Sequence, residues 1–136
     1  MAKPNIEFVG WKNDSDLALM YEGCTALIFP GKEDFGITPV EAMAAGMPVI
    51  AFGEGGAAET VTREAGVLFQ PQSVDALCEA VLKVERGEVK LEEQACRARA
   101  ALFTRERFQK ELSEAVKDAW KAAGKDVAAL SGVLTG

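Results

Sequence analysis

The sequence contains no histidine, and its lysine and arginine residues form no dense cluster. Without histidine, the commonest general base and the commonest metal ligand are both missing, so Asp, Glu and the backbone must supply any chemistry. The 15 basic and 21 acidic residues give a formal net charge of −6. An acidic chain without a basic patch excludes nucleic acid as a partner and disfavours binding to an anionic membrane.

Long apolar runs and paired cysteines are missing as well. No run approaches the roughly 18 apolar residues of a membrane-spanning helix, and the first residues lack the apolar stretch of a signal peptide. Cys24, Cys78 and Cys96 are odd in number and have no metal-site spacing, which predicts reduced thiols. We therefore expect a soluble, cytoplasmic protein. Its 136 residues, 49% of them apolar, suffice for one domain with a closed core.

Four short apolar segments alternate with helical patterns over the first half of the chain. The segments predicted as strands are Ile6–Gly10, Ala26–Pro30, Val49–Phe52 and Val67–Gln70. The second and third have apolar residues in succession, which is typical of strands covered on both faces. Strict alternation of strand and helix predicts an α/β fold with a parallel, four-stranded Rossmann-like sheet flanked by helices.

Helix start and stop signals lie between these strands. Asp14 or Ser15 can cap a first helix, which Gly23 then ends. Thr38 can cap a second helix, with Gly46 closing it.

The chain after residue 70 is predicted to be helical. Ser73 caps one helix, and two charged amphipathic helices follow at residues 91–103 and 104–123. The last of them is expected to bury a stripe of apolar side chains, namely Phe108, Leu112, Val116 and Trp120. We predict a domain over residues 1–123 and a flexible tail over residues 124–136.

The segment from Pro30 to Ala51 carries the chemistry. It follows a strand, turns through Gly36 and opens a helix, and ligands of open α/β sheets bind at this carboxyl edge. Gly36 allows a ligand to approach the backbone closely. The N–H groups of Ile37 and Thr38, together with the helix dipole, form a site that favours a diphosphate.

Two glutamates in this segment, Glu33 and Glu41, bracket seven residues. Phe35-Gly36 lies between them, and the motifs at residues 41–46, 48–51 and 55–61 follow in order. On these motifs, residues 5–110 resemble the GT4-like retaining GT-B glycosyltransferases (glycosyl transferases group 1). The resemblance is to part of the C-terminal, nucleotide-sugar donor-binding domain of mannosyltransferase-like members.

The resemblance implies a role for each matching position. Glu33, the implied catalytic residue, would bind hydroxyls of the donor sugar, and Glu41 would bind the ribose hydroxyls. A carboxylate suits a vicinal diol because its two oxygens accept charge-assisted hydrogen bonds. The other implied donor-binding residues are Phe35, Gly36, Ile37 and Thr38 for the sugar and diphosphate, and Gly10 and Trp11 near the base. The implied substrate is a nucleotide-diphosphosugar, with GDP-mannose as our first expectation, and no metal or cofactor is implied.

Both glutamates also have ordinary structural explanations. Thr38-x-x-Glu41 is the pattern of a capping box, in which the glutamate returns a hydrogen bond to the Thr38 amide. Glu33 by itself is a solvated loop acid, since acidic side chains are commonly exposed.

Two parts of the family's enzymes have no counterpart in this sequence: the acceptor-binding N-terminal domain, and the strand–helix–strand whose Arg and Lys clamp the diphosphate. We therefore expect the chain to be inactive alone. Ile6–Gly10 and Ala26–Pro30 then either pair directly, giving four strands in sequence order, or need a second chain between them. The alternative functions are a non-catalytic, standalone or vestigial homo-oligomeric module, and one chain of a split glycosyltransferase whose partner carries the N-terminal domain.

Overall fold

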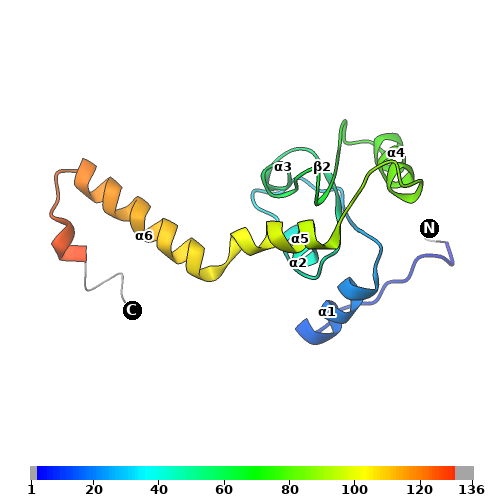
Figure 1. Ribbon diagram of the computed structural model, residues 1–136, viewed down its shortest axis with the longest axis horizontal. Helices are drawn as coiled ribbons and strands as arrows, with labels where there is room; N and C mark the ends of the chain where they lie inside the picture. The colour runs from blue at the N-terminus through cyan, green and yellow to red at the C-terminus, as the bar shows by residue number, and fades with distance from the viewer. Residues whose placement is uncertain (1–2, 131–136) are drawn as a thin grey trace. The chain divides into compact units, whose positions relative to one another are not determined.

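The computed structural model describes residues 3–130 and divides the chain into two compact units, residues 1–100 and 101–136. The elements of the first unit, shown in Figure 1, are α1 (Asp14–Gly23), β1 (Leu27–Phe29), α2 (Ile37–Ala44), β2 (Val49–Phe52), α3 (Gly56–Thr60), β3 (Gly66–Phe69), α4 (Val74–Glu85) and α5 (Glu93–Ala100). The second unit contains a 3-10 helix η1 (Ala101–Phe103), α6 (Arg105–Ala122) and a 3-10 helix η2 (Val127–Leu130).

The sheet has three parallel strands in the order β1-β2-β3, with Leu27 opposite Val49 and Val49 opposite Gly66. The predicted α/β fold with a parallel sheet in sequence order is therefore confirmed. The predicted number of strands is wrong, since the described residues form three rather than four.

The missing strand is Ile6–Gly10, which is irregular and exposed. The ring of Phe8 is 84% exposed, and Gly10 has a φ of +64°. Strand propensity largely reflects packing against neighbours, and the edge strand that the prediction assigns to this segment, β1, has only three residues. Direct pairing of the first two predicted strands is thus contradicted by the structure.

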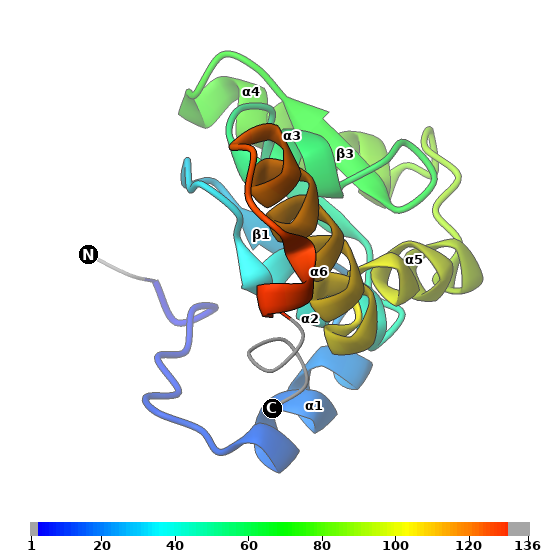
Figure 2. The ribbon, with the colours of Figure 1, turned by 90° about the vertical axis from the view of Figure 1, so that its left-hand side faces the viewer.

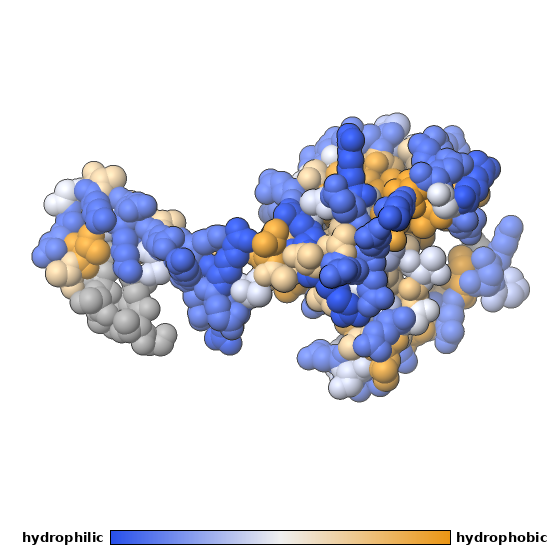
Figure 3. Space-filling view, in the orientation of Figure 1, coloured by the Kyte–Doolittle hydropathy of each residue, from blue (hydrophilic) through white to orange (hydrophobic). Residues whose placement is uncertain are grey.

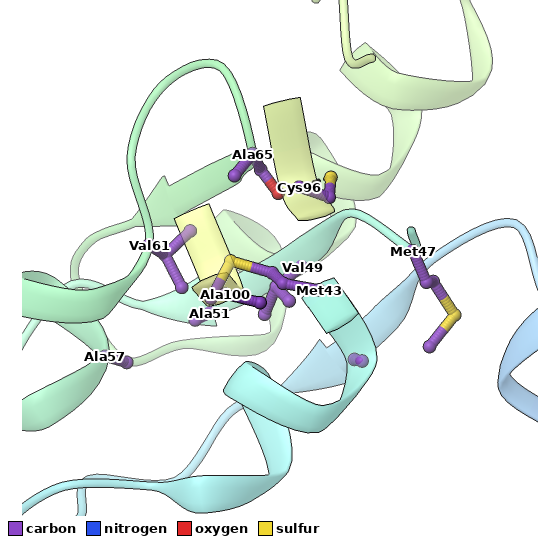
Figure 4. Close-up of a cluster of buried hydrophobic side chains, with 10 residues drawn as sticks. Met43, Met47, Val49, Ala51, Ala57, Val61, Ala65, Cys96 and Ala100 are labelled. Atoms are coloured by element: carbon purple, nitrogen blue, oxygen red, sulfur yellow. Dashed lines mark hydrogen bonds between the residues drawn. The ribbon is translucent and has the colours of Figure 1, made fainter. Parts of the chain in front are cut away.

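Helices cover both faces of the sheet. In Figure 2, α2 and α5 lie on one side of the strands and α4 lies on the other. On the α2 side, Met43, Val49 and Cys96 are buried in one apolar cluster, which Figure 4 shows. On the α4 side, Ile50 and Phe69 anchor the second cluster. Burial raises the pKa of the Cys96 thiol, whose Sγ faces the Ala65 carbonyl oxygen at 3.6 Å.

Only the central strand is covered as the sequence predicts. All four residues of β2 are buried, whereas Ile28 in β1 is half exposed. Ile28 points to the same face as Ile50, but α4 packs mainly over β2 and β3. The expectation that β1 is covered on both faces is therefore wrong. Apolar side chains reach the surface of this unit, as Figure 3 shows.

One of the three predicted helix caps is present, and the other two helices begin at other residues. The Ser73 hydroxyl accepts a hydrogen bond from the Ala76 amide, as predicted, and the Thr104 hydroxyl caps α6 by accepting from the Arg107 amide. α1 is capped by Asn13, whose side chain accepts from the Asp16 amide, and not by Asp14 or Ser15.

The apolar stripe of α6 is not buried as predicted. Phe108 and Leu112 are exposed, while Val116 and Trp120 are half-buried. An amphipathic helix buries its stripe only against another element, and the described part of this unit offers only two short 3-10 helices.

The end of the described chain folds against Trp120. Its indole Nε1 donates to the Asp126 carbonyl at 3.1 Å, and the Lys125 ammonium lies 4.4 Å from its ring centroid. Residues 131–136 lie outside the described residues, so the flexible tail stays a prediction. Among residues 3–130, no helix is both long and apolar enough to cross a membrane.

Candidate functional site

The loop between β1 and α2 lies at the carboxyl edge of the sheet, next to the loop between β2 and α3. The Gly56 amide donates to the Glu33 carbonyl oxygen at 2.8 Å, which joins the two backbones. Lys32 Nζ lies 2.9 Å from Glu54 Oε2, and this hydrogen bond raises the pKa of Lys32. This ion pair links the two loops, and the Lys32 side chain stays largely exposed.

Glycine is required where the loops meet. A β-carbon on Gly55 would lie 2.4 Å from the Glu33 carbonyl oxygen, and Gly55 has a φ of +70°. A β-carbon on Gly56 would lie 2.3 Å from the Phe35 carbonyl oxygen and 2.4 Å from its Cα. These approaches are shorter than real Cβ contacts, so the two glycines fix the position of residues 33–35.

The helix α2 begins directly behind Gly36, which is its N-cap with a φ of +74°. No side chain caps this helix, so the predicted capping role of Thr38 is wrong. Thr38 is the second helical residue, and Pro39 occupies the first turn, where its lack of an N–H costs no intrahelical bond. The amides of Ile37 and Thr38 have no intrahelical acceptor, and they are the donors that an anion at this helix end would use.

Side chains of the loop face outward although its backbone is held in place. Glu33 is exposed, and Phe35 and Ile37 are 48% and 63% exposed. The structure therefore brings Glu33, Phe35, Gly36, Ile37 and Thr38 together in one turn, in which Glu33, Phe35 and Ile37 are exposed, Thr38 is half-buried and Gly36 is buried.

Glu41 lies one turn further along α2 and lines a cavity of about 380 Å³ between α1 and α2. Asp14, Leu17 and Tyr21 line the α1 side, and Arg97 of α5 closes one end. Within the described part of the chain, the Glu41 carboxylate accepts no capping hydrogen bond from the Thr38 amide. The capping-box explanation of Glu41 is therefore contradicted, and its carboxylate is left facing the cavity.

The Tyr21 side chain lines the same cavity, and its pKa is shifted there. Burial, and then the negative charge of Glu41, raise the pKa of the Tyr21 phenol above its ordinary value near 10. Because both effects favour the neutral phenol in the folded state, stability falls as the pH rises through that ordinary value toward the folded pKa.

Two arginines of α5 contribute contacts that the sequence did not predict. Arg97 donates to the carbonyl oxygens of Ala44 and Ala45, at the end of α2, and Arg99 donates to that of Thr60 at 2.8 Å, at the end of α3. Arg97 also forms an i,i+4 ion pair with Glu93 at 2.9 Å on the helix surface. No local signal marks the carbonyl contacts of the two arginines, which join residues 39 to 53 positions apart.

Gly10 and Trp11 lie outside the helices and strands of the first unit. They lie in the coil before α1, where the Trp11 indole is 87% exposed. Their predicted place beside the nucleotide base stays a prediction.

This arrangement is a parallel α/β unit of the kind found in GT-B glycosyltransferases, with its polar loops gathered at the carboxyl edge. The sequence profile of the family described as glycosyl transferases group 1 matches residues 1–101. The chain therefore belongs to the glycosyl transferases group 1 family.

Named relatives agree with this assignment. The chain is 36% identical over 81 residues to an alpha-1,3/1,6-mannosyltransferase ALG2 of Rhizomucor pusillus, covering 59% of this chain and 18% of that protein. It is 32% identical over 88 residues to a GDP-mannose-dependent monoacylated alpha-(1-6)-phosphatidylinositol monomannoside mannosyltransferase of Corynebacterium glutamicum, covering 59% of this chain and 23% of that protein.

A solved structure agrees as well. Sucrose-phosphate synthase from Thermosynechococcus elongatus superposes with a TM-score of 0.73 at 31% identity, covering 85% of this chain and 30% of that one. The chain thus spans about a fifth of the length of the curated relatives named above, and under a third of the structural neighbour.

Proposed function

We propose that this chain forms the donor-binding part of a retaining mannosyltransferase and binds a nucleotide-diphosphosugar at the β1–α2 loop. The observation that carries the proposal is the uncapped start of α2 behind Gly36, with Glu33 in the loop before it and Glu41 one turn further along the helix. Helix N-termini with free amides favour phosphate groups even on an acidic protein.

Each group has a chemical task in this proposal. The amides of Ile37 and Thr38 donate to the diphosphate, and Glu41 accepts from the ribose diol. Glu33 accepts from hydroxyls of the transferred sugar, where its charge also stabilises positive charge that develops at the reacting carbon. The leaving diphosphate assists a front-face transfer, so the two glutamates are not a glycosidase acid and nucleophile pair.

Isothermal titration calorimetry with GDP, UDP and ADP and their sugars tests the binding claim. We expect GDP-mannose to bind best, because one relative is named as GDP-mannose-dependent. We expect a dissociation constant in the upper micromolar to millimolar range, about 4 to 6 kcal/mol of binding free energy, because part of the pocket has no counterpart in this chain. Absence of heat with every nucleotide at millimolar concentration would contradict the proposal for the isolated chain.

The two alternatives differ in what covers the open edge of β1. A homo-oligomeric module covers it with a second copy, whereas a split glycosyltransferase covers it with a partner chain that carries the acceptor domain. The unpaired backbone edge of β1 among the described residues favours a covering chain in either case. Light scattering on the purified chain separates them: a stable oligomer supports the module, and a monomer supports the split enzyme.

A further inference from the structure

We propose that Arg97 is a positioning residue for the pocket at Glu41, acting through the far end of α2. The inference rests on the function proposed above for Glu41, but its main test needs no nucleotide. The guanidinium donates from Nη1 to the Ala44 carbonyl oxygen at 2.9 Å and from Nη2 to the Ala45 carbonyl oxygen at 2.8 Å. The last carbonyls of a helix have no intrahelical donor, and a cation there also complements the helix dipole.

Glu93 holds the guanidinium in this orientation. Its Oε1 accepts from Arg97 Nε at 3.0 Å and from Nη2 at 2.9 Å, one turn back along α5. The Arg97 guanidinium therefore donates both to backbone carbonyl oxygens and to a carboxylate oxygen. A planar guanidinium with several fixed N–H groups suits this set of acceptors better than an ammonium does.

The position after α2 leaves room for this contact. A β-carbon on Gly46 would lie 2.4 Å from Glu93 Cγ and 3.0 Å from Arg97 Nε. Gly46 also has a φ of +91°, so glycine both ends the helix and allows α5 to approach it. The end of α2 is thus in direct contact with the Glu93–Arg97 pair.

Fixing this end of α2 also fixes Glu41. The helix has only eight residues, and the Ala45 amide donates to the Glu41 carbonyl oxygen at 3.1 Å, so the two are one turn apart. Glu41, Ala45 and Arg97 line the same cavity, whose opposite wall is α1. Ala42 and Met43, both fully buried, anchor the core side of α2, and Tyr21 of α1 packs against the same cluster. Arg97 holds the exposed end of the helix, and with it the direction in which the Glu41 carboxylate faces.

The single tyrosine of the chain makes this testable by absorbance, since Tyr21 shares the cavity with Glu41. Asp14, Glu22, Glu41 and Arg97 are the ionisable groups that line the cavity with it. The tyrosinate titration near 295 nm is compared for the wild type, Arg97→Met, Arg97→Lys and Arg99→Met, with circular dichroism confirming the fold at each pH. Arg99→Met is the matched control, because it removes an equivalent contact at the end of α3 without touching this cavity.

The expected result is that Arg97→Met lowers the Tyr21 pKa toward its ordinary value, that Arg97→Lys gives an intermediate shift, and that Arg99→Met leaves it at the wild-type value. The direction of the change in the Tyr21 pKa separates a positioning role from a direct charge effect, because removing a nearby positive charge alone would raise that pKa. No change, a rise, or an equal fall in Arg99→Met would overturn the proposal. For a wild type that binds nucleotide, Arg97→Met should also weaken the affinity by about tenfold. If the wild type binds none, the proposed function fails, while the titration still decides the role of Arg97.

Discussion

Replacing Gly56 with alanine is expected to lower the free energy of unfolding by about 3 kcal/mol, the upper end of the cost of overpacking. The added β-carbon would lie 2.3 Å from the Phe35 carbonyl oxygen, and backbone atoms cannot yield as a flexible side chain can. Chemical denaturation measures the change. The same substitution should also displace the loop that holds Glu33, because the Gly56 amide donates to its carbonyl oxygen.

Gly31→Ala is the matched control for this prediction. Gly31 lies in the same β1–α2 loop, yet a β-carbon there would meet nothing within 4 Å. We expect its stability to stay within about 0.5 kcal/mol of the wild type. Equal stability of the Gly56 and Gly31 variants would show that the two loops are not packed backbone to backbone as described.

Replacing Glu41 with alanine is expected to weaken nucleotide affinity by roughly 10- to 100-fold, the range of a lost charge-assisted hydrogen bond. Stability should change by less than about 0.5 kcal/mol, because Glu41 is exposed and caps no helix. The capping box suggested by the sequence would instead have cost about 1 kcal/mol. Calorimetry and denaturation on the same variant therefore separate the two explanations of this residue.

The loss of nucleotide affinity expected for Glu41→Ala is opposite in sign to the simple effect of charge. Removing a negative charge near a diphosphate should strengthen binding through electrostatics alone. Glu22→Ala is the control, since Glu22 lines the same cavity from α1 and lies outside the Glu33-x7-Glu41 motif. We expect Glu22→Ala to leave affinity unchanged or slightly higher. Equal weakening in both variants, or none in Glu41→Ala and Glu41→Gln, would count against a ribose contact.

Local sequence signals predicted much of the fold because they report local physics. Ser73 caps its helix, as a hydroxyl side chain placed before apolar residues at helical spacing predicts. The run Val49–Phe52 is buried on both faces, as successive apolar residues indicate. Glu33 to Thr38 form one turn at the sheet edge because a strand, a glycine and a helix start follow each other directly.

The errors arose where a distant neighbour decides the outcome. Ile6–Gly10 has the composition of a strand, but without a paired edge it stays irregular and exposed. The stripe of Phe108 and Leu112 has helical spacing, yet the described part of its unit supplies no surface to cover it. Thr38 matched a cap by its spacing to Glu41, whereas Gly36 began the helix two residues earlier.

The contacts of Arg97 and Arg99 were beyond sequence reasoning for a related reason. Each binds carbonyl oxygens of a helix end far away in the chain, and a carbonyl carries no residue-specific signal. The only local hint was the Glu93 to Arg97 spacing, which is shared by many solvated helix faces.

The claim that a diphosphate binds at the start of α2 is tested most directly by amide NMR of the isotope-labelled chain during titration with GDP and, separately, guanosine. GDP should shift the amides of Gly36, Ile37 and Thr38, with a smaller change at Glu41, and guanosine should leave those of Ile37 and Thr38 unmoved. Shifts confined to other elements such as α4, or equal shifts at Ile37 and Thr38 with guanosine, would contradict the account.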